Sequence, residues 1–123
     1  MSAAVGERGS VSVVAAAVLV ALLICTMGVT DLAHVLRGRA QARTAADAAA
    51  LAAAQELAVS SGADPAALAA AVALRNGATL VSCVCPIGSY EAVVEVERDV
   101  SGLWLIPGTL VLNVDARAVV DLP

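Results

Sequence analysis

The chain has 123 residues, a net charge of −4 and 60% hydrophobic residues, yet it holds one Trp, one Tyr and no Phe. All seven basic residues are Arg. The negative balance excludes a nucleic-acid-binding surface, because phosphate neutralisation requires clustered cations. Outside an apolar N-terminal segment roughly 90 residues remain, which suffice for one small domain but not for a deep catalytic cleft.

The N-terminal segment has the length and composition of a membrane span. Residues 11–30 carry no charge and follow the tetrapeptide Glu7-Arg8-Gly9-Ser10. A helix rises about 1.5 Å per residue, so roughly 20 apolar residues cross the hydrocarbon core of a bilayer. We therefore predict a head over residues 1–10 and a transmembrane helix over residues 11–30, with the lipid bilayer as its first partner.

This segment is expected to remain as an anchor rather than to be cleaved as a signal peptide. No small-x-small site follows it, and the large residue Ile24 precedes Cys25 where a lipoprotein signal has a small one. Lipoprotein anchoring at Cys25 stays as a minor alternative. Three arginines, Arg37, Arg39 and Arg43, follow the span, which by the positive-inside rule favours a cytoplasmic C-terminal part.

An alanine-rich stretch over residues 31–61 continues the helix beyond the membrane. Alanine is the strongest helix former, so one helix is predicted from Ser10 to Ala58. Arg43 and Asp47 are four residues apart and are expected to pair. The alanine face has two compatible interpretations: it lies on the chain's own sheet, or it also packs against other subunits.

A small domain is predicted over residues 62–123, and it begins with a second helix. Asp64 is a good N-cap, Pro65 fits the first helical position, and Asn76-Gly77 provides a stop after Arg75. The apolar residues of this helix are expected to form a stripe for packing, and they are Leu68, Val72 and Leu74.

The last 45 residues change from a helical period to an alternating one. Two faces alternate over residues 94–100, where only Arg98 interrupts the apolar face, and over residues 110–121, which is typical of half-buried antiparallel strands. A shorter strand is predicted over residues 79–84, with turns at residues 86–89 and 106–109. The predicted fold is α+β: a long membrane helix, a short helix and a small three-stranded sheet.

Residues that could carry chemistry are few and scattered. His34 has Asp31 within one helical turn but no companion nucleophile, so interfacial packing is expected for it. Trp104 is expected to belong to the core. The acidic row of one strand is expected to be a solvated face, and its members are Glu91, Glu95, Glu97 and Asp99. We predict that the chain is not an enzyme and holds no cofactor or metal.

Two cysteines, Cys83 and Cys85, are separated by one residue. Alternate residues on a strand point to the same face and are too far apart for a relaxed bridge unless the strand is distorted, and Pro86 can supply that distortion. A local disulfide, two free thiols and an intermolecular contact remain open. Neither zinc-type spacing nor a CxxC redox pair is present.

Three features together resemble a known family. Glu7-Arg8-Gly9-Ser10 directly precedes the apolar span, the block Ala45-Ala-Asp-Ala-Ala-Ala-Leu-Ala-Ala-Ala54 follows it, and a short sheet ends the chain. This arrangement is similar to the TadE/TadG-like, pilin-like proteins of tight-adherence pilus and secretion systems, and looks closest to the small TadE-like proteins of actinobacteria. The resemblance implies a single-pass cell-membrane protein with an extracytoplasmic C-terminal domain.

The resemblance also implies a role and a processing site. The role is a non-enzymatic, pseudopilin-like subunit that associates through its helix with other pilin-like or Tad-apparatus subunits, or with copies of itself. Related prepilins are cut after a glycine, which corresponds here to a cut between Gly9 and Ser10. The fifth residue after that cut is Val14, where type IV pilins usually have Glu. The alternative is a bitopic membrane scaffold or regulator with a cytoplasmic C-terminal domain.

Overall fold

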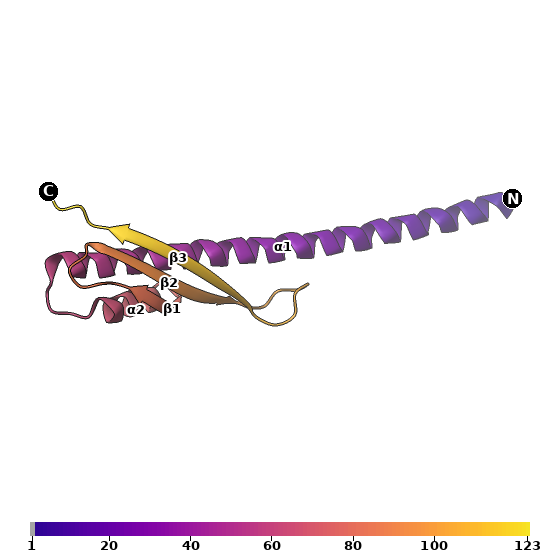
Figure 1. Ribbon diagram of the computed structural model, residues 1–123. Coiled ribbons are helices and arrows are strands. Elements are labelled where there is room, and N and C mark those ends of the chain that lie inside the picture. Colours follow the sequence, from indigo (N-terminus) through magenta and orange to yellow (C-terminus); the bar gives the residue numbers. More distant parts are fainter. Residues whose placement is uncertain (1) are drawn as a thin grey trace.

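The computed structural model describes the backbone of residues 2–123 and the side chains from Gly9 onward. One helix, α1 (Ser2–Val59), makes up almost half of the chain. With 58 residues it is about 87 Å long at the standard helical rise. Figure 1 shows α2 and the sheet lying along its C-terminal half, while the N-terminal half projects alone. The helix begins eight residues before the predicted start at Ser10, and its end agrees with the prediction to one residue.

The second helix, α2 (Pro65–Arg75), has the predicted boundaries. The Asp64 carboxylate accepts a hydrogen bond from the Ala66 backbone N–H, and Asn76 caps the other end. The predicted apolar stripe of Leu68, Val72 and Leu74 is not the buried face of α2. The buried residues are Ala69 and Ala73, Val72 is half-buried, and Leu68 is exposed. Leu74 is largely exposed. Alanine lets α2 approach its neighbours closely, and this close packing decides which face is buried.

A carboxylate closes the turn between the two helices. Glu56 accepts hydrogen bonds from the Ser61 hydroxyl at 2.8 and 2.7 Å and from the Ala63 backbone N–H at 3.1 Å. The Ser61 hydrogen bond is the main cause that lowers the pKa of Glu56 below its usual range. The turn is thus held by a charged side chain from the last turn of α1.

The sheet is antiparallel with the order β1-β2-β3. Its strands are β1 (Thr79–Val84), β2 (Glu91–Val100) and β3 (Leu110–Val119). The register of β1 on β2 shifts between Leu80 and Ser82, so Val81 forms a bulge. β2 alternates between buried and partly exposed residues as predicted, and only Arg98 breaks its buried face. The predicted α+β fold is confirmed.

The core is built almost entirely from small side chains. A stripe of α1, which we call the alanine stripe, is fully buried between the sheet and α2. Its members are Ala42, Ala45, Ala46, Ala49, Ala50, Ala53 and Ala54. The largest fully buried side chains opposite are Val94 and Val96 of β2. Close backbone approach therefore replaces the large aromatic side chains that this chain lacks.

At Gly38 the sheet approaches α1 closely. A Cβ atom placed on Gly38 would lie 2.6 Å from Val100 Cγ2 and 3.4 Å from Leu112 Cδ1. A Cβ on Gly28, in the same helix, would lie at an ordinary 3.7 Å from Leu105 Cδ1. The glycine that weakens the helical pattern is thus required by packing, since it admits the ends of β2 and β3.

These two glycines should respond to the same substitution with opposite signs. Gly38→Ala should destabilise the domain by about 1 kcal/mol, because overpacking costs roughly 1–3 kcal/mol and exceeds the gain of about 1 kcal/mol in helix propensity. Gly28→Ala should be neutral or stabilising. Thermal unfolding of the full chain in detergent micelles measures both effects. Equal shifts of the unfolding temperature in the two variants would show that packing does not require glycine at position 38.

Candidate functional site

The N-terminal half of α1 is the candidate membrane and interaction element. Among the described residues, one helical segment, Gly9–Val59, is long and apolar enough to cross a membrane, and its most apolar window is not buried by the rest of the protein. The Thr26 hydroxyl donates to the carbonyl oxygens of Leu22 and Leu23. The Thr30 hydroxyl donates to the carbonyl oxygen of Thr26. The hydroxyls of these two threonines can therefore face lipid without remaining unpaired.

The predicted cleavage site lies inside this helix. The peptide bond between Gly9 and Ser10 falls within α1, and nothing packs within 4 Å of the Cβ position of Gly9. Val14, the fifth residue after that bond, is exposed on the span. A peptidase would have to unwind the first turns of α1, and the glycine lowers the cost of doing so.

The alanine stripe is not available to other subunits. It is fully covered by the chain's own sheet and by α2, so the first of the two interpretations of the alanine face is correct for this stripe. What α1 leaves uncovered beyond the span is the face outside the alanine stripe, which includes the exposed residues Leu32, Leu36 and Leu51. Association with other helices must use this face or the span itself.

One face of the span suits close contact between helices. Ala17, Ala21 and Cys25 are spaced four residues apart, so they lie along one side of the helix. All three are exposed, and Cys25 is a free cysteine. Small residues at this spacing let membrane helices approach closely.

Asp31, the first charged residue after the span, is buried and holds a distant loop. Its side chain is only 5% exposed. One carboxylate oxygen accepts the backbone N–H of Trp104 and the other that of Leu105, each at 2.8 Å. These residues belong to the loop between β2 and β3, and we call residues 101–109 the β2–β3 loop. Both oxygens of Asp31 are thus used by this loop, and neighbouring His34 lies exposed on α1.

The expected position of Trp104 in the core is wrong. The indole is 72% exposed, and Leu105 and Ile106 are about half exposed beside it. The loop backbone follows the hydrogen bonds to Asp31, which leaves these side chains on the outside. The sequence marked the segment as unusual, but its partner lies 73 residues earlier in the chain.

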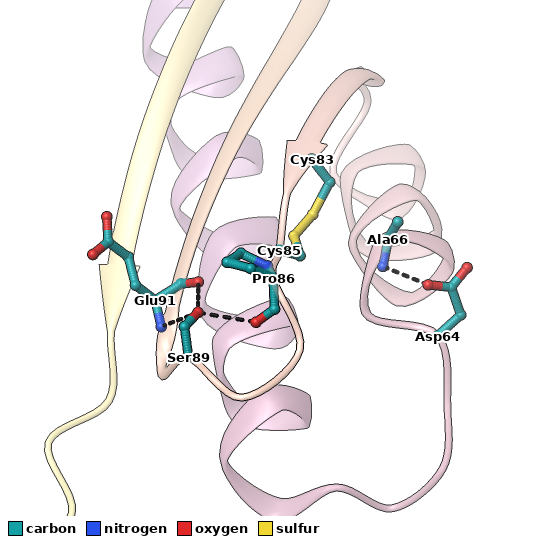
Figure 2. Close-up of a disulfide and its surroundings, with 7 residues drawn as sticks. All are labelled: Asp64, Ala66, Cys83, Cys85, Pro86, Ser89 and Glu91. Carbon is teal, nitrogen blue, oxygen red and sulfur yellow. Dashed lines mark hydrogen bonds between the residues drawn. A yellow bond between two sulfur atoms is a disulfide. The ribbon is translucent and has the colours of Figure 1, made fainter.

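Cys83 and Cys85 are brought together where β1 ends. The structure joins them in a disulfide with the Cα atoms 5.6 Å apart. Figure 2 shows Pro86 directly after Cys85 and the Ser89 hydroxyl bonded to the Pro86 and Glu91 backbones in the turn that follows. Because β1 stops at Val84, Cys85 leaves the strand geometry that would separate the two sulfurs.

The acidic strand face holds one ion pair and no cation site. Arg117 donates through Nε and Nη2 to the two oxygens of Glu91, at 2.7 and 2.9 Å. Glu95 lies directly opposite Asp115 on β3. Within residues 9–123, no three His, Cys, Asp or Glu side chains converge as metal ligands would. The predicted pair of Arg43 and Asp47 is present at 3.3 Å.

The fold and its surfaces fit a class of protein: single-pass membrane proteins in which one long helix carries a small α+β domain. Residues 9–56 match the family of putative Flp pilus-assembly TadE/G-like proteins, which confirms the resemblance seen in the sequence. The matched segment is the part of α1 that contains the span and the alanine stripe. The matched family is structural rather than catalytic. Searches of curated proteins and of solved structures found no match.

Proposed function

We propose that this chain is a pseudopilin-like, non-enzymatic subunit of a Tad-type pilus or related secretion apparatus. α1 holds it in the membrane and associates with the helices of other subunits, and the sheet domain lies outside the cytoplasm. The observation that carries this proposal is the TadE/G-like match over residues 9–56, which falls on a helix whose most apolar window is not buried by the rest of the chain.

Covalent chemistry supports an extracytoplasmic domain. The bonded pair of Cys83 and Cys85 is the kind of link that persists in oxidising compartments and is rare in the cytoplasm. The arginines after the span favour the opposite orientation and thus the alternative, a scaffold with a cytoplasmic domain. The two observations agree if the short N-terminal head stays in the cytoplasm during insertion and the C-terminal domain is exported despite these arginines.

Orientation is tested by a single engineered cysteine. Ala63 is exposed in the turn between α1 and α2, so Ala63→Cys in a Cys25→Ser background should react with a membrane-impermeant maleimide in intact cells. The same variant after lysis gives the full reactivity of the site. Labelling that requires lysis would place the domain in the cytoplasm and favour the scaffold.

Helix association is tested by oxidative cross-linking at the native Cys25. A subunit that packs along the face of Ala17, Ala21 and Cys25 should give a cross-linked product in cells, either with itself or with another subunit. The matched control is Cys25→Ala with Leu23→Cys, which moves the thiol about 200° around the helix at nearly the same depth. Equal cross-linking at both positions would mean random collision and would count against a defined interface.

Cleavage is tested by the mass of the membrane-bound form. A prepilin-type cut predicts a mature chain that starts at Ser10. An intact N-terminus would leave a subunit that remains anchored in the membrane without processing, and a chain acylated at Cys25 would establish the lipoprotein alternative.

A further inference from the structure

The β2–β3 loop lies beside the end of the membrane span. Gly28 of the span lies beside this loop, since a Cβ on it would lie 3.7 Å from Leu105 Cδ1. Met27 and Gly28 are half-buried, whereas every other described residue of the span is exposed. Gly28 precedes the end of the uncharged segment at Thr30 by two residues, or about 3 Å along the helix. The loop therefore reaches the level at which α1 enters the bilayer.

The composition of this loop suits lipid rather than water. Residues 100–114 carry no charged side chain, although acidic residues flank them on both sides. Trp104, Leu105 and Ile106 expose their side chains together at the loop tip. Contiguous exposed apolar residues mark interaction surfaces, and Trp is enriched where a membrane meets water because its ring is apolar and its N–H is polar.

Two backbone N–H groups of the loop already have hydrogen-bond partners within the protein. Both are bonded to the carboxylate of Asp31. Unpaired backbone donors are costly at the edge of a bilayer, so the pairing of these two N–H groups lowers the cost of placing the loop there. Arg37, two turns beyond Asp31 and exposed, lies at a height where it can reach lipid phosphates.

We propose that the β2–β3 loop is a second membrane attachment, in which Trp104, Leu105 and Ile106 insert into the interface of the same bilayer that α1 crosses. The occupant of this apolar surface is lipid, because the surface is continuous with the span itself. The attachment fixes the tilt and height of the sheet domain over the membrane. This attachment requires that α1 crosses the bilayer, but it does not require a role in a pilus. The experiments below therefore test it separately from the proposed function.

Trp104 is the single tryptophan of the chain and reports on its own surroundings. In vesicles of phosphatidylcholine and phosphatidylglycerol, the emission of the full-length protein should be quenched by lipids brominated near the headgroup end of the acyl chain. Lipids brominated deeper in the chain should quench it less. With iodide on both sides of the bilayer, quenching of Trp104 should be about fivefold weaker than for a fully solvated indole.

A matched reporter supplies the solvated reference. Ile87 is 94% exposed in the turn between β1 and β2, at the far end of the sheet. Trp104→Phe with Ile87→Trp should give full iodide quenching and no quenching by brominated lipid. If Trp104 behaves like this reporter, the loop lies in water and the proposal is overturned. Protection from iodide without quenching by brominated lipid would mean contact with another protein copy, and would overturn it equally.

A second variant separates insertion from a merely structural role. Leu105→Ser with Ile106→Ser keeps Trp104 and the hydrogen bonds to Asp31 but removes the apolar neighbours. Quenching by brominated lipid should fall at least about threefold while hydrogen exchange of Val94 and Val96 in β2 stays unchanged. Unchanged lipid quenching in this variant would contradict insertion by the loop tip.

Discussion

Ala49→Leu should speed hydrogen exchange at the amides of Val94 and Val96 by at least about tenfold. Ala49 is fully buried in the alanine stripe, and the buried cluster around it consists of further alanines, the valines of β2 and a single leucine, Leu57. A leucine brings three additional carbon atoms into a region that is packed without large side chains. Overpacking of this kind costs typically 1–3 kcal/mol, and about 1.4 kcal/mol is a tenfold change in an opening equilibrium.

The effect should be large because the domain is small. A domain of this size has only a few kcal/mol of net stability, so a loss of about 2 kcal/mol is a considerable part of it. The matched control is Ala40→Leu, at an exposed position of the same helix. This variant should leave exchange in β2 within about twofold of the wild type, because surface substitutions usually change stability by less than 0.5 kcal/mol. Similar exchange rates in the two variants would contradict a tightly packed alanine stripe.

Local patterns in the sequence were sufficient to predict the helices and strands of this fold. The alternation of β2 and β3, the Asp64-Pro65 start of α2 and the run of alanines in α1 each act through neighbouring residues. The start of α1 was less clear, because the head has no helix-weakening residues apart from Gly6 and Gly9. The family resemblance came from the same local features, and the matched residues 9–56 are those that carry them.

Contacts between segments that are distant in the chain could not be predicted from such local patterns. The sequence left open whether the alanine stripe faces its own sheet or another subunit, because alanine tolerates either partner. Leucines of α2 looked like the better packing residues, yet the close approach of the helices favoured Ala69 and Ala73. The exposure of Trp104 depends on Asp31, and no short-range pattern links these two residues.

Asp31→Ala should release the β2–β3 loop while the sheet remains folded. The carboxylate accepts two backbone N–H groups at 2.8 Å, and nothing else in the loop can replace it once it is removed. Hydrogen bonds to a charged group contribute about 1.5–3 kcal/mol each, so the amides of Trp104 and Leu105 should exchange about a hundredfold faster in detergent micelles. Val94 and Val96, in the central strand, should exchange nearly as in the wild type.

Two further variants show whether charge and position both matter. Asp31→Asn keeps the shape of the side chain but turns one acceptor into a donor that faces a backbone N–H, so its loop protection should lie between that of Asp31→Ala and the wild type. Asp47→Asn removes an exposed carboxylate of the same helix that pairs only with Arg43, and it should leave the loop unchanged. Loop amides that keep their protection in Asp31→Ala would mean that other contacts hold the loop. A selective loss would establish that the first charge after the span connects the membrane helix to the end of the sheet.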